Sequence, residues 1–200
     1  LFRSEISKME TSTGTVTIDG IQDMQFDYYG STLACAMRDN TIQLYDTTKE
    51  TPSLVATLKG HTAPVWQVKW CHPRFGNLLV SCGYDKTVNV WMKEQTGEYA
   101  IVYQYKHHTK SVNAISVFPE TEGLKIACGS SDGEVSVIEY VEATKSWKTN
   151  SFVAHASGVN AVEVVKLEKE IAIVTGGCDS IVKVFHRVND QWECGKELKD

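Results

Sequence analysis

The stretch GHTAPVWQVKWCHPRFGNLLVSCGYDKTVNVW, residues 60–91, decides the fold. Residues 65–70 alternate in polarity, residues 78–82 are almost continuously apolar, and His-Pro-Arg-Phe-Gly-Asn separates the two runs. A third run, 87–92, follows a tight turn, and a fourth, 99–105, follows Gln-Thr-Gly-Glu. Short runs of β-branched and aromatic residues between turn residues predict four β-strands rather than helices, whose apolar period is about 3.6 residues.

The same unit recurs along the chain. Four aspartates between apolar runs lie 46, 47 and 47 residues apart: Asp39, Asp85, Asp132 and Asp179. Three histidines repeat every 47 residues: His61, His108 and His155. Four strands in each unit of about 45 residues are typical of the blade of a β-propeller. We therefore predict one all-β domain over residues 1–200, an open propeller with blades at about 14–58, 59–105, 106–153 and 154–200.

Polar residues at fixed places in the repeat predict hydrogen bonds that brace each blade. A histidine before the inner strand can bond the aspartate of a later turn, a Ser or Thr can bond the other ring nitrogen, and an indole N–H can cap the chain. The second unit has the complete tetrad: His61, Ser81, Asp85 and Trp91. The fourth unit has His155, Thr175 and Asp179, and the third has His108 and Asp132. Thr17 stands at the histidine position of the first unit, which we expect to be the least braced.

Ser, His and Asp together are also the composition of a hydrolase triad. Here the set recurs blade after blade with members missing, and the sequence has no Gly-x-Ser-x-Gly elbow, so we predict no catalytic residue and no enzyme. Residues 129–133 lack the following helix that a phosphate-binding loop needs. Six cysteines without CxxC spacing predict reduced, buried thiols rather than a zinc site, and we predict no metal and no cofactor.

Composition excludes several classes of partner. The formal net charge is −5 and no basic stripe is visible, which argues against nucleic acid. No apolar run is long enough to span a bilayer. The opening Leu-Phe-Arg-Ser-Glu-Ile-Ser-Lys has no signal-peptide pattern, so we expect a cytoplasmic protein.

The residues that open this section also carry a family resemblance. Residues 60–91 closely resemble the second blade of the Sec-thirteen family, the small WD-repeat subunit of the COPII outer coat. Three more stretches agree, namely residues 27–30 (Asp-Tyr-Tyr-Gly), 127–133 (Ala-Cys-Gly-Ser-Ser-Asp-Gly) and 174–179 (Val-Thr-Gly-Gly-Cys-Asp). The resemblance runs from about Ile21 to the C-terminus in the same order.

The resemblance implies a WD-repeat propeller of six blades, of which about four are present here and two C-terminal blades are absent. It implies that a large α-solenoid partner inserts a strand segment as a seventh blade, beside the first. That partner would be the large outer-coat subunit of COPII vesicles, or a nucleoporin of the nuclear pore Y-complex; a third family assembly acts in nutrient signalling at lysosomal or vacuolar membranes. The implied role is a non-catalytic scaffold in ER-to-Golgi transport.

The same resemblance implies where the protein resides and what it touches. We expect it in the cytoplasm, peripheral at endoplasmic reticulum exit sites and COPII vesicles, and at the nuclear pore, with membrane association through the coat only. The first blade is expected to meet the solenoid partner. Its predicted partner-binding residues are Ile18, Met24, Phe26, Ile42 and Leu44; alternation does not decide which side of the blade faces the partner and which faces the second blade.

A second function remains open from sequence. A WD-repeat adaptor binds peptide motifs on the face made by the loops that enter the inner strands. Those loops read Gly-His-Thr-Ala-Pro, His-His-Thr-Lys-Ser and Ala-His-Ala-Ser-Gly, without a basic or aromatic cluster, which favours the scaffold.

The fourth unit is shorter than the others. Only six residues separate Val164 from Ile171, where the second unit has a full Trp-Cys-His-Pro-Arg-Phe-Gly-Asn connection. We interpret this as a loss of residues around 167–170.

Overall fold

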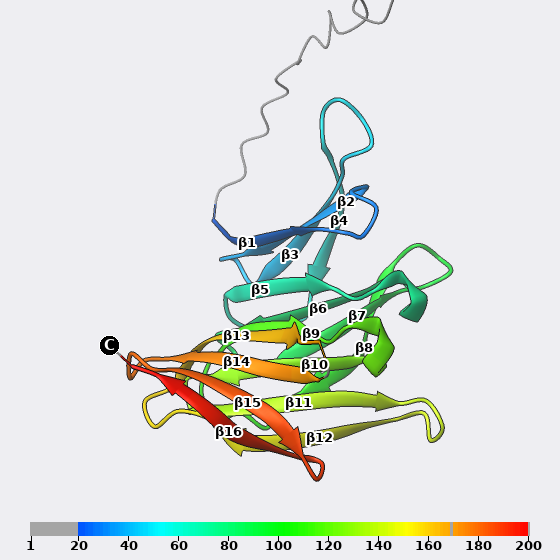
Figure 1. Ribbon diagram of the computed structural model, residues 1–200. Helices are drawn as coiled ribbons and strands as arrows, with labels where there is room; N and C mark the ends of the chain where they lie inside the picture. The colour runs from blue at the N-terminus through cyan, green and yellow to red at the C-terminus, as the bar shows by residue number, and fades with distance from the viewer. Residues whose placement is uncertain (1–19, 169, 200) are drawn as a thin grey trace, which may run out of the picture.

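The computed structural model describes residues 20–168 and 170–199, and its strands form four antiparallel sheets (Figure 1). The first two sheets are β1 (Ile21–Phe26), β2 (Thr32–Met37), β3 (Thr41–Asp46), β4 (Ser53–Lys59) and β5 (Val65–Trp70), β6 (Leu78–Gly83), β7 (Val88–Lys93), β8 (Tyr99–Tyr105). The other two are β9 (Val112–Val117), β10 (Lys125–Ser130), β11 (Glu134–Val141), β12 (Ser146–Val153) and β13 (Val159–Lys166), β14 (Ile171–Gly177), β15 (Val182–Val188), β16 (Gln191–Leu198). Strands pair in chain order within each sheet, which confirms the predicted all-β fold of four-stranded units.

Consecutive sheets pack face to face, and their inner strands hold them together. Strand β1 contacts β5, β5 contacts β9, and β9 contacts β13. Apolar clusters fill each junction, with Leu79 and Trp91 between the first two sheets, Ile115 and Ile126 between the next two, and Phe185 at the last. Because each unit supplies buried apolar side chains of this kind, the sequence repeat produces one apolar core between each pair of neighbouring sheets.

The two ends of the sheets differ. We call the end with the β4–β5, β8–β9 and β12–β13 loops the histidine end, because His61, His108 and His155 lie there. The turns β2–β3, β6–β7, β10–β11 and β14–β15 reach the same end, and the remaining connections make the far end.

Short 3-10 turns occupy two of the far-end connections: η1 (Pro73–Phe75) in the second sheet and η2 (Glu120–Glu122) in the third. The guanidinium of Arg74 donates to the carbonyl of Glu120 at 3.2 Å, so the two turns touch. In the fourth sheet the connection is a tight turn instead, in which Leu167 N–H donates to Glu170 O at 2.8 Å.

Cysteine positions follow the sheets only in part. Cys35, Cys71, Cys82 and Cys128 are buried, as predicted, whereas Cys178 and Cys194 are exposed, because they lie in the last sheet's turn and edge strand. All six thiols are free. Burial raises the pKa of the Cys71 and Cys128 thiols to about 12, so neither forms a thiolate near neutral pH.

Candidate functional site

The second sheet brings its four predicted tetrad residues together. His61 Nδ1 lies 2.9 Å from Asp85 Oδ2, and His61 Nε2 lies 2.7 Å from Ser81 Oγ. The indole N–H of Trp91 donates to the same hydroxyl oxygen at 2.8 Å. A carboxylate can only accept, so Nδ1 carries the proton and Nε2 accepts from the hydroxyl of Ser81. The result is one continuous chain of hydrogen bonds from the turn to the indole.

The third and fourth sheets repeat the arrangement with fewer members. His108 Nδ1 lies 3.0 Å from Asp132 Oδ2, and the thiol of Cys128 stands 3.5 Å from Nε2 where a hydroxyl would be. In the fourth sheet, His155 Nδ1 lies 2.9 Å from Asp179 Oδ1 and Nε2 lies 2.8 Å from Thr175 Oγ1. Phe185 and Ile138 stand at the position of Trp91 and supply no donor, so both chains end one bond earlier.

The first sheet has a different turn. Within the described residues, Asp39 accepts only from the backbone N–H of Thr41 at 3.1 Å and from its hydroxyl at 2.6 Å. Thr17 and Ile18 lie outside the described residues. The aspartate of this unit therefore closes its own turn, and Thr41 is its only side-chain partner among the described residues.

The turn aspartates of the second and third sheets, Asp85 and Asp132, are ionised, and the reason differs slightly between them. Burial opposes ionisation of Asp85, but the hydrogen bonds from His61, Thr62 and Thr87 outweigh it and lower the pKa of the carboxyl. Burial also opposes ionisation of Asp132, but hydrogen bonds from the backbone N–H groups of Thr109 and Glu134, together with His108, outweigh it and lower the pKa of this carboxyl. Each carboxylate is therefore a fixed acceptor at neutral pH.

Ser81, His61 and Asp85 are the residue types of a hydrolase triad, but their geometry does not suit catalysis. Ser81 is fully buried, and its Oγ already serves the His61 ring and the Trp91 indole, so no substrate carbonyl can reach it. Cys128, in the equivalent place of the third sheet, is also fully buried with a raised pKa. Both sets act as internal hydrogen-bond networks.

Sequence reasoning missed the glycine that makes room for the histidine. A Cβ on Gly83 would lie 2.7 Å from the Pro64 carbonyl and 3.3 Å from His61 Nδ1. On Gly177 it would collide with the His155 ring and with Asp179. The signal was available, since each glycine stands two residues before a turn aspartate.

Sequence reasoning also missed hydrogen bonds that join neighbouring sheets. Side chains on each inner strand accept from backbone N–H groups of the next one: Asp23 from Val68 (3.1 Å), Gln25 from Trp70 (2.7 Å), Gln67 from Ile115 (2.6 Å) and Ser116 from Val164 (3.0 Å). Donor and acceptor stand 45 to 48 residues apart, close to the repeat period. A polar residue inside an apolar strand of the repeat was the available signal.

The first sheet has an exposed apolar side that faces away from the second sheet. Asp23 and Gln25 point toward the second sheet, so the alternate residues Met24 and Phe26 point away from it, 59% and 54% exposed. Met24 pairs with Cys35, Phe26 with Leu33, and Tyr45 with Leu54 across the strands. We call the exposed side chains of Met24, Phe26 and Leu54, with the half-buried Leu33, the open face; Tyr45 lies buried beneath it.

Two predicted partner-binding residues lie on the opposite side. Ile42 and Leu44 are 0% and 1% exposed and pack in one cluster with Val65, Leu79 and Trp91 of the second sheet. Their assignment to the partner surface was therefore wrong. Ala36 and Ala34 stand opposite them on β2, and these small side chains leave room for the second sheet to approach.

A sequence-family model identifies the repeat. The model described as "WD domain, G-beta repeat" matches residues 10–46, 52–92 and 100–139, which is more than half of the chain. The chain belongs to the WD40-repeat family. The three matches fall on the first three sheets and the residues before them, and the fourth sheet has the same WD40 strand order.

Among WD40 proteins, the similar relatives are SEC13 proteins. The chain is 36% identical over 190 residues to the protein SEC13 homolog of Drosophila melanogaster, covering 87% of this chain and 53% of the relative. It is 37% identical over 188 residues to the protein transport protein sec13 of Emericella nidulans, with 84% and 60% covered. A SEC13 of Cryptococcus neoformans is 40% identical over 213 residues, with 90% and 64% covered. These matches confirm the resemblance to the Sec-thirteen family.

The chain spans between about half and two thirds of the length of these relatives. Within the WD40 sheets as described, no group of three or more His, Cys, Asp or Glu side chains is arranged to hold a metal ion. The described residues also include no helix of the length and apolarity that crossing a membrane requires.

Proposed function

We propose that this chain belongs to a non-catalytic scaffold protein of the COPII coat in ER-to-Golgi transport, with a second role in the nuclear pore complex. The relatives named protein transport protein, at 36–40% identity over most of the chain, support a transport role. The buried tetrads support a rigid scaffold, because their polar groups bond to one another and leave no reactive group for a substrate.

The observation that carries a docking role is the open face. Met24, Phe26 and Leu54 are each more than half exposed, on a sheet whose other side is packed. Contiguous exposed apolar side chains of this kind mark interaction surfaces. We propose that a partner's strand segment packs on the open face as an added blade, with Met24 and Phe26 as contact residues. The partner would be the α-solenoid outer-coat subunit of COPII, or a Y-complex nucleoporin.

This proposal places the protein in the cytoplasm, at endoplasmic reticulum exit sites and COPII vesicles, and at the nuclear pore. Its association with the membrane would be peripheral and mediated by the coat. The adaptor function is the second candidate, and exposed Tyr84, edge-on to Trp66 at 6.3 Å on the histidine end, supports it. The connections at the histidine end carry four carboxylates and four Lys or Arg side chains, so their net formal charge is zero and they do not attract a charged peptide. The open face, in contrast, offers exposed apolar side chains to a strand.

Co-purification tests the docking role. The chain is co-expressed with the tagged solenoid partner, either unchanged, as Met24→Asp, as Phe26→Asp, or as the control Val153→Asp. Val153 is 72% exposed on the edge strand β12 of the third sheet, far from the open face. The two open-face variants are expected to lose the partner while strand content by circular dichroism is kept.

Unchanged binding by both open-face variants would remove the first sheet as the docking surface. Equal loss in the Val153→Asp control would mean that any new charge on an edge disrupts the chain. Localisation is checked separately by fluorescence microscopy of the tagged protein against an exit-site marker, and a uniform distribution would argue against the coat.

A further inference from the structure

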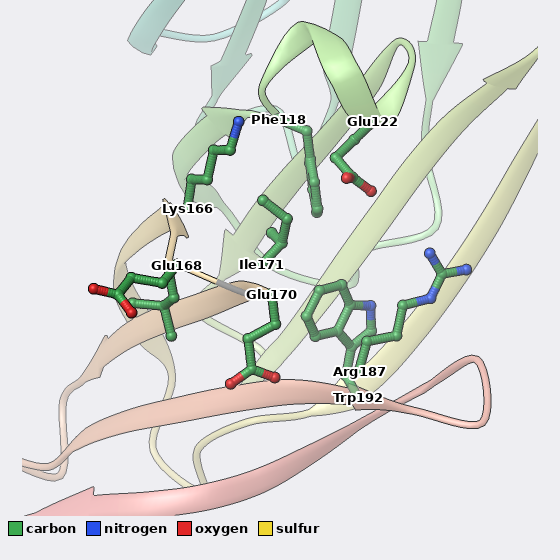
Figure 2. Close-up of a pocket in the computed structure, with 9 residues that line it drawn as sticks. Phe118, Glu122, Lys166, Glu168, Glu170, Ile171, Arg187 and Trp192 are labelled. Atoms are coloured by element: carbon green, nitrogen blue, oxygen red, sulfur yellow. The ribbon is translucent and has the colours of Figure 1, made fainter.

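A cavity of about 370 Å³ opens at the far end, between the third and fourth sheets. Figure 2 shows Phe118, Ile171 and Trp192 close together in its lining. The two aromatic ring centroids are 6.1 Å apart, and Trp192 also stacks on Phe152 at 6.4 Å. The volume is at the small end of ligand cavities, roughly 300–1,000 Å³, so it suits one large side chain better than a whole cofactor.

At this junction the described residues of the fourth sheet form no 3-10 turn between β13 and β14. At the preceding junction, η1 brings Phe75 against the core and Arg74 onto the Glu120 carbonyl, so that the turn of one sheet lies on the turn of the next. The described residues of the tight turn between β13 and β14 make no such hydrogen bond to η2. The shortened fourth unit, a feature of the sequence that the scaffold role does not use, therefore exposes an aromatic-walled space.

Charged side chains surround this cavity. The carboxylates Glu122, Glu168 and Glu170 line it together with the cations Lys166 and Arg187 (Figure 2). Glu170 Oε1 lies 3.1 Å from His186 Nδ1, and Arg187 Nη2 lies 2.9 Å from Asp190 Oδ1. Glu122 and Glu168 make no ion pair with any residue that the structure describes.

The whole far end is acidic. By sequence its connections hold ten carboxylates and four cations, a net formal charge of −6: Asp27, Glu50, Glu94, Glu98, Glu120, Glu122, Glu142, Glu168, Glu170 and Asp190 against Lys49, Arg74, Lys145 and Lys169. The connections at the histidine end hold four of each sign: Asp39, Asp85, Asp132 and Asp179 against Arg38, Lys86, Lys106 and Lys110. The field of the described molecule therefore attracts cations to the end where the cavity opens.

We propose that this cavity binds a lysine or arginine side chain from a basic linear segment of a partner protein. The cation would lie against the ring of Trp192, where the aromatic quadrupole attracts positive charge, and within reach of the unpaired Glu122 carboxylate. Neighbouring cations of the segment would meet the remaining carboxylates of the far end. Nucleic acids and anionic lipid surfaces are disfavoured, because the same carboxylates repel them.

Peptide binding to the full chain tests the proposal. The chain is immobilised through its N-terminus, and a synthetic peptide of alternating Arg, Lys and Gly is passed over it, with a Glu-Gly peptide as the charge control. Glu122→Gln and Trp192→Leu are each expected to weaken the basic peptide by roughly tenfold. Glu142→Gln removes the same charge from the same end, in the β11–β12 turn outside the cavity, and is expected to weaken it less than twofold.

Each other outcome decides against the site. If Glu142→Gln weakens binding as much as Glu122→Gln, the peptide responds to the overall charge of the far end and not to the cavity. If Trp192→Leu binds normally, the aromatic wall has no role. Thermal unfolding of each variant shows whether Trp192→Leu is folded, and Glu122→Gln decides the matter if it is not. Phe26→Asp, on the open face, is expected to keep full peptide affinity, so this proposal and the docking proposal fail separately.

Discussion

Replacing Asp85 with alanine is expected to destabilise the chain by roughly 2–4 kcal/mol. The carboxylate accepts from His61 Nδ1 at 2.9 Å, from Thr62 N–H at 2.9 Å and from the Thr87 hydroxyl at 2.8 Å. Thr62 is exposed and can bond water, but His61 is only 7% exposed, so its N–H loses its closest partner and keeps only the Thr87 hydroxyl oxygen, 3.3 Å from Nδ1. A buried donor left with so weak a partner costs about 1–3 kcal/mol, and the lost hydrogen bonds add about 1 kcal/mol.

The assay is urea unfolding followed by tryptophan fluorescence, because the indole of Trp91 is part of the same hydrogen-bond chain. Asp39→Ala is the matched control, an aspartate at the same place in the repeat that bonds only Thr41 among the described residues. It is expected to cost less than about 1 kcal/mol. If the two variants lose equal free energy of unfolding, the histidine does not brace the second sheet and the reasoning is refuted.

Three further outcomes follow from the same geometry. Ile42→Ala should cost roughly 2–4 kcal/mol and Met24→Ala less than about 1 kcal/mol in urea unfolding, since one is core and the other exposed; similar costs would contradict the assignment of the two sides. The pKa of Asp85 is lowered in the folded protein, so its ionisation stabilises the fold at pH values above the unfolded pKa of about 3.9, and this stability is lost as pH falls through the folded pKa. The urea concentration at the unfolding midpoint should therefore decrease when the pH is lowered below about 4, and it should decrease less in Asp85→Asn. Light scattering should show association of the isolated chain that Phe26→Asp reduces; a compact monomer would argue against an unpartnered open face.

The repeat allowed much of the fold to be predicted from sequence. Spacing of the turn aspartates and alternation within each run placed the second-unit strands within about one residue, for example 78–82 predicted and Leu78–Gly83 observed. The tetrad partners could be named because hydrogen-bonding types recur at fixed offsets, and His61, Ser81 and Asp85 lie together at those offsets.

What the sequence could not predict depends on which side of a sheet is covered. Alternation along a strand shows that Met24 and Asp23 lie on opposite sides of the first sheet, but it does not show which side faces the second sheet. Ile42 and Leu44 were therefore assigned to the partner surface, although they pack against the second sheet. The bond from Val68 N–H to Asp23 shows which side that is, and it is visible only once two sheets are placed side by side. The cavity beside Trp192 was hidden for a similar reason, because residues of η2 in the third sheet and of the β13–β14 turn in the fourth sheet line it together.

The bonds in which an inner strand's backbone N–H donates to a side chain of a neighbouring inner strand run in one direction along the chain. The accepting side chains Asp23, Gln67 and Ser116 each precede their donors by about one repeat. A ribosome releases the earlier residues first, and chains generally fold from the N-terminal side during synthesis. Each completed sheet thus already displays the oxygen that the next inner strand needs when that strand emerges. The order in which the strands are synthesised is therefore compatible with docking blade by blade during translation.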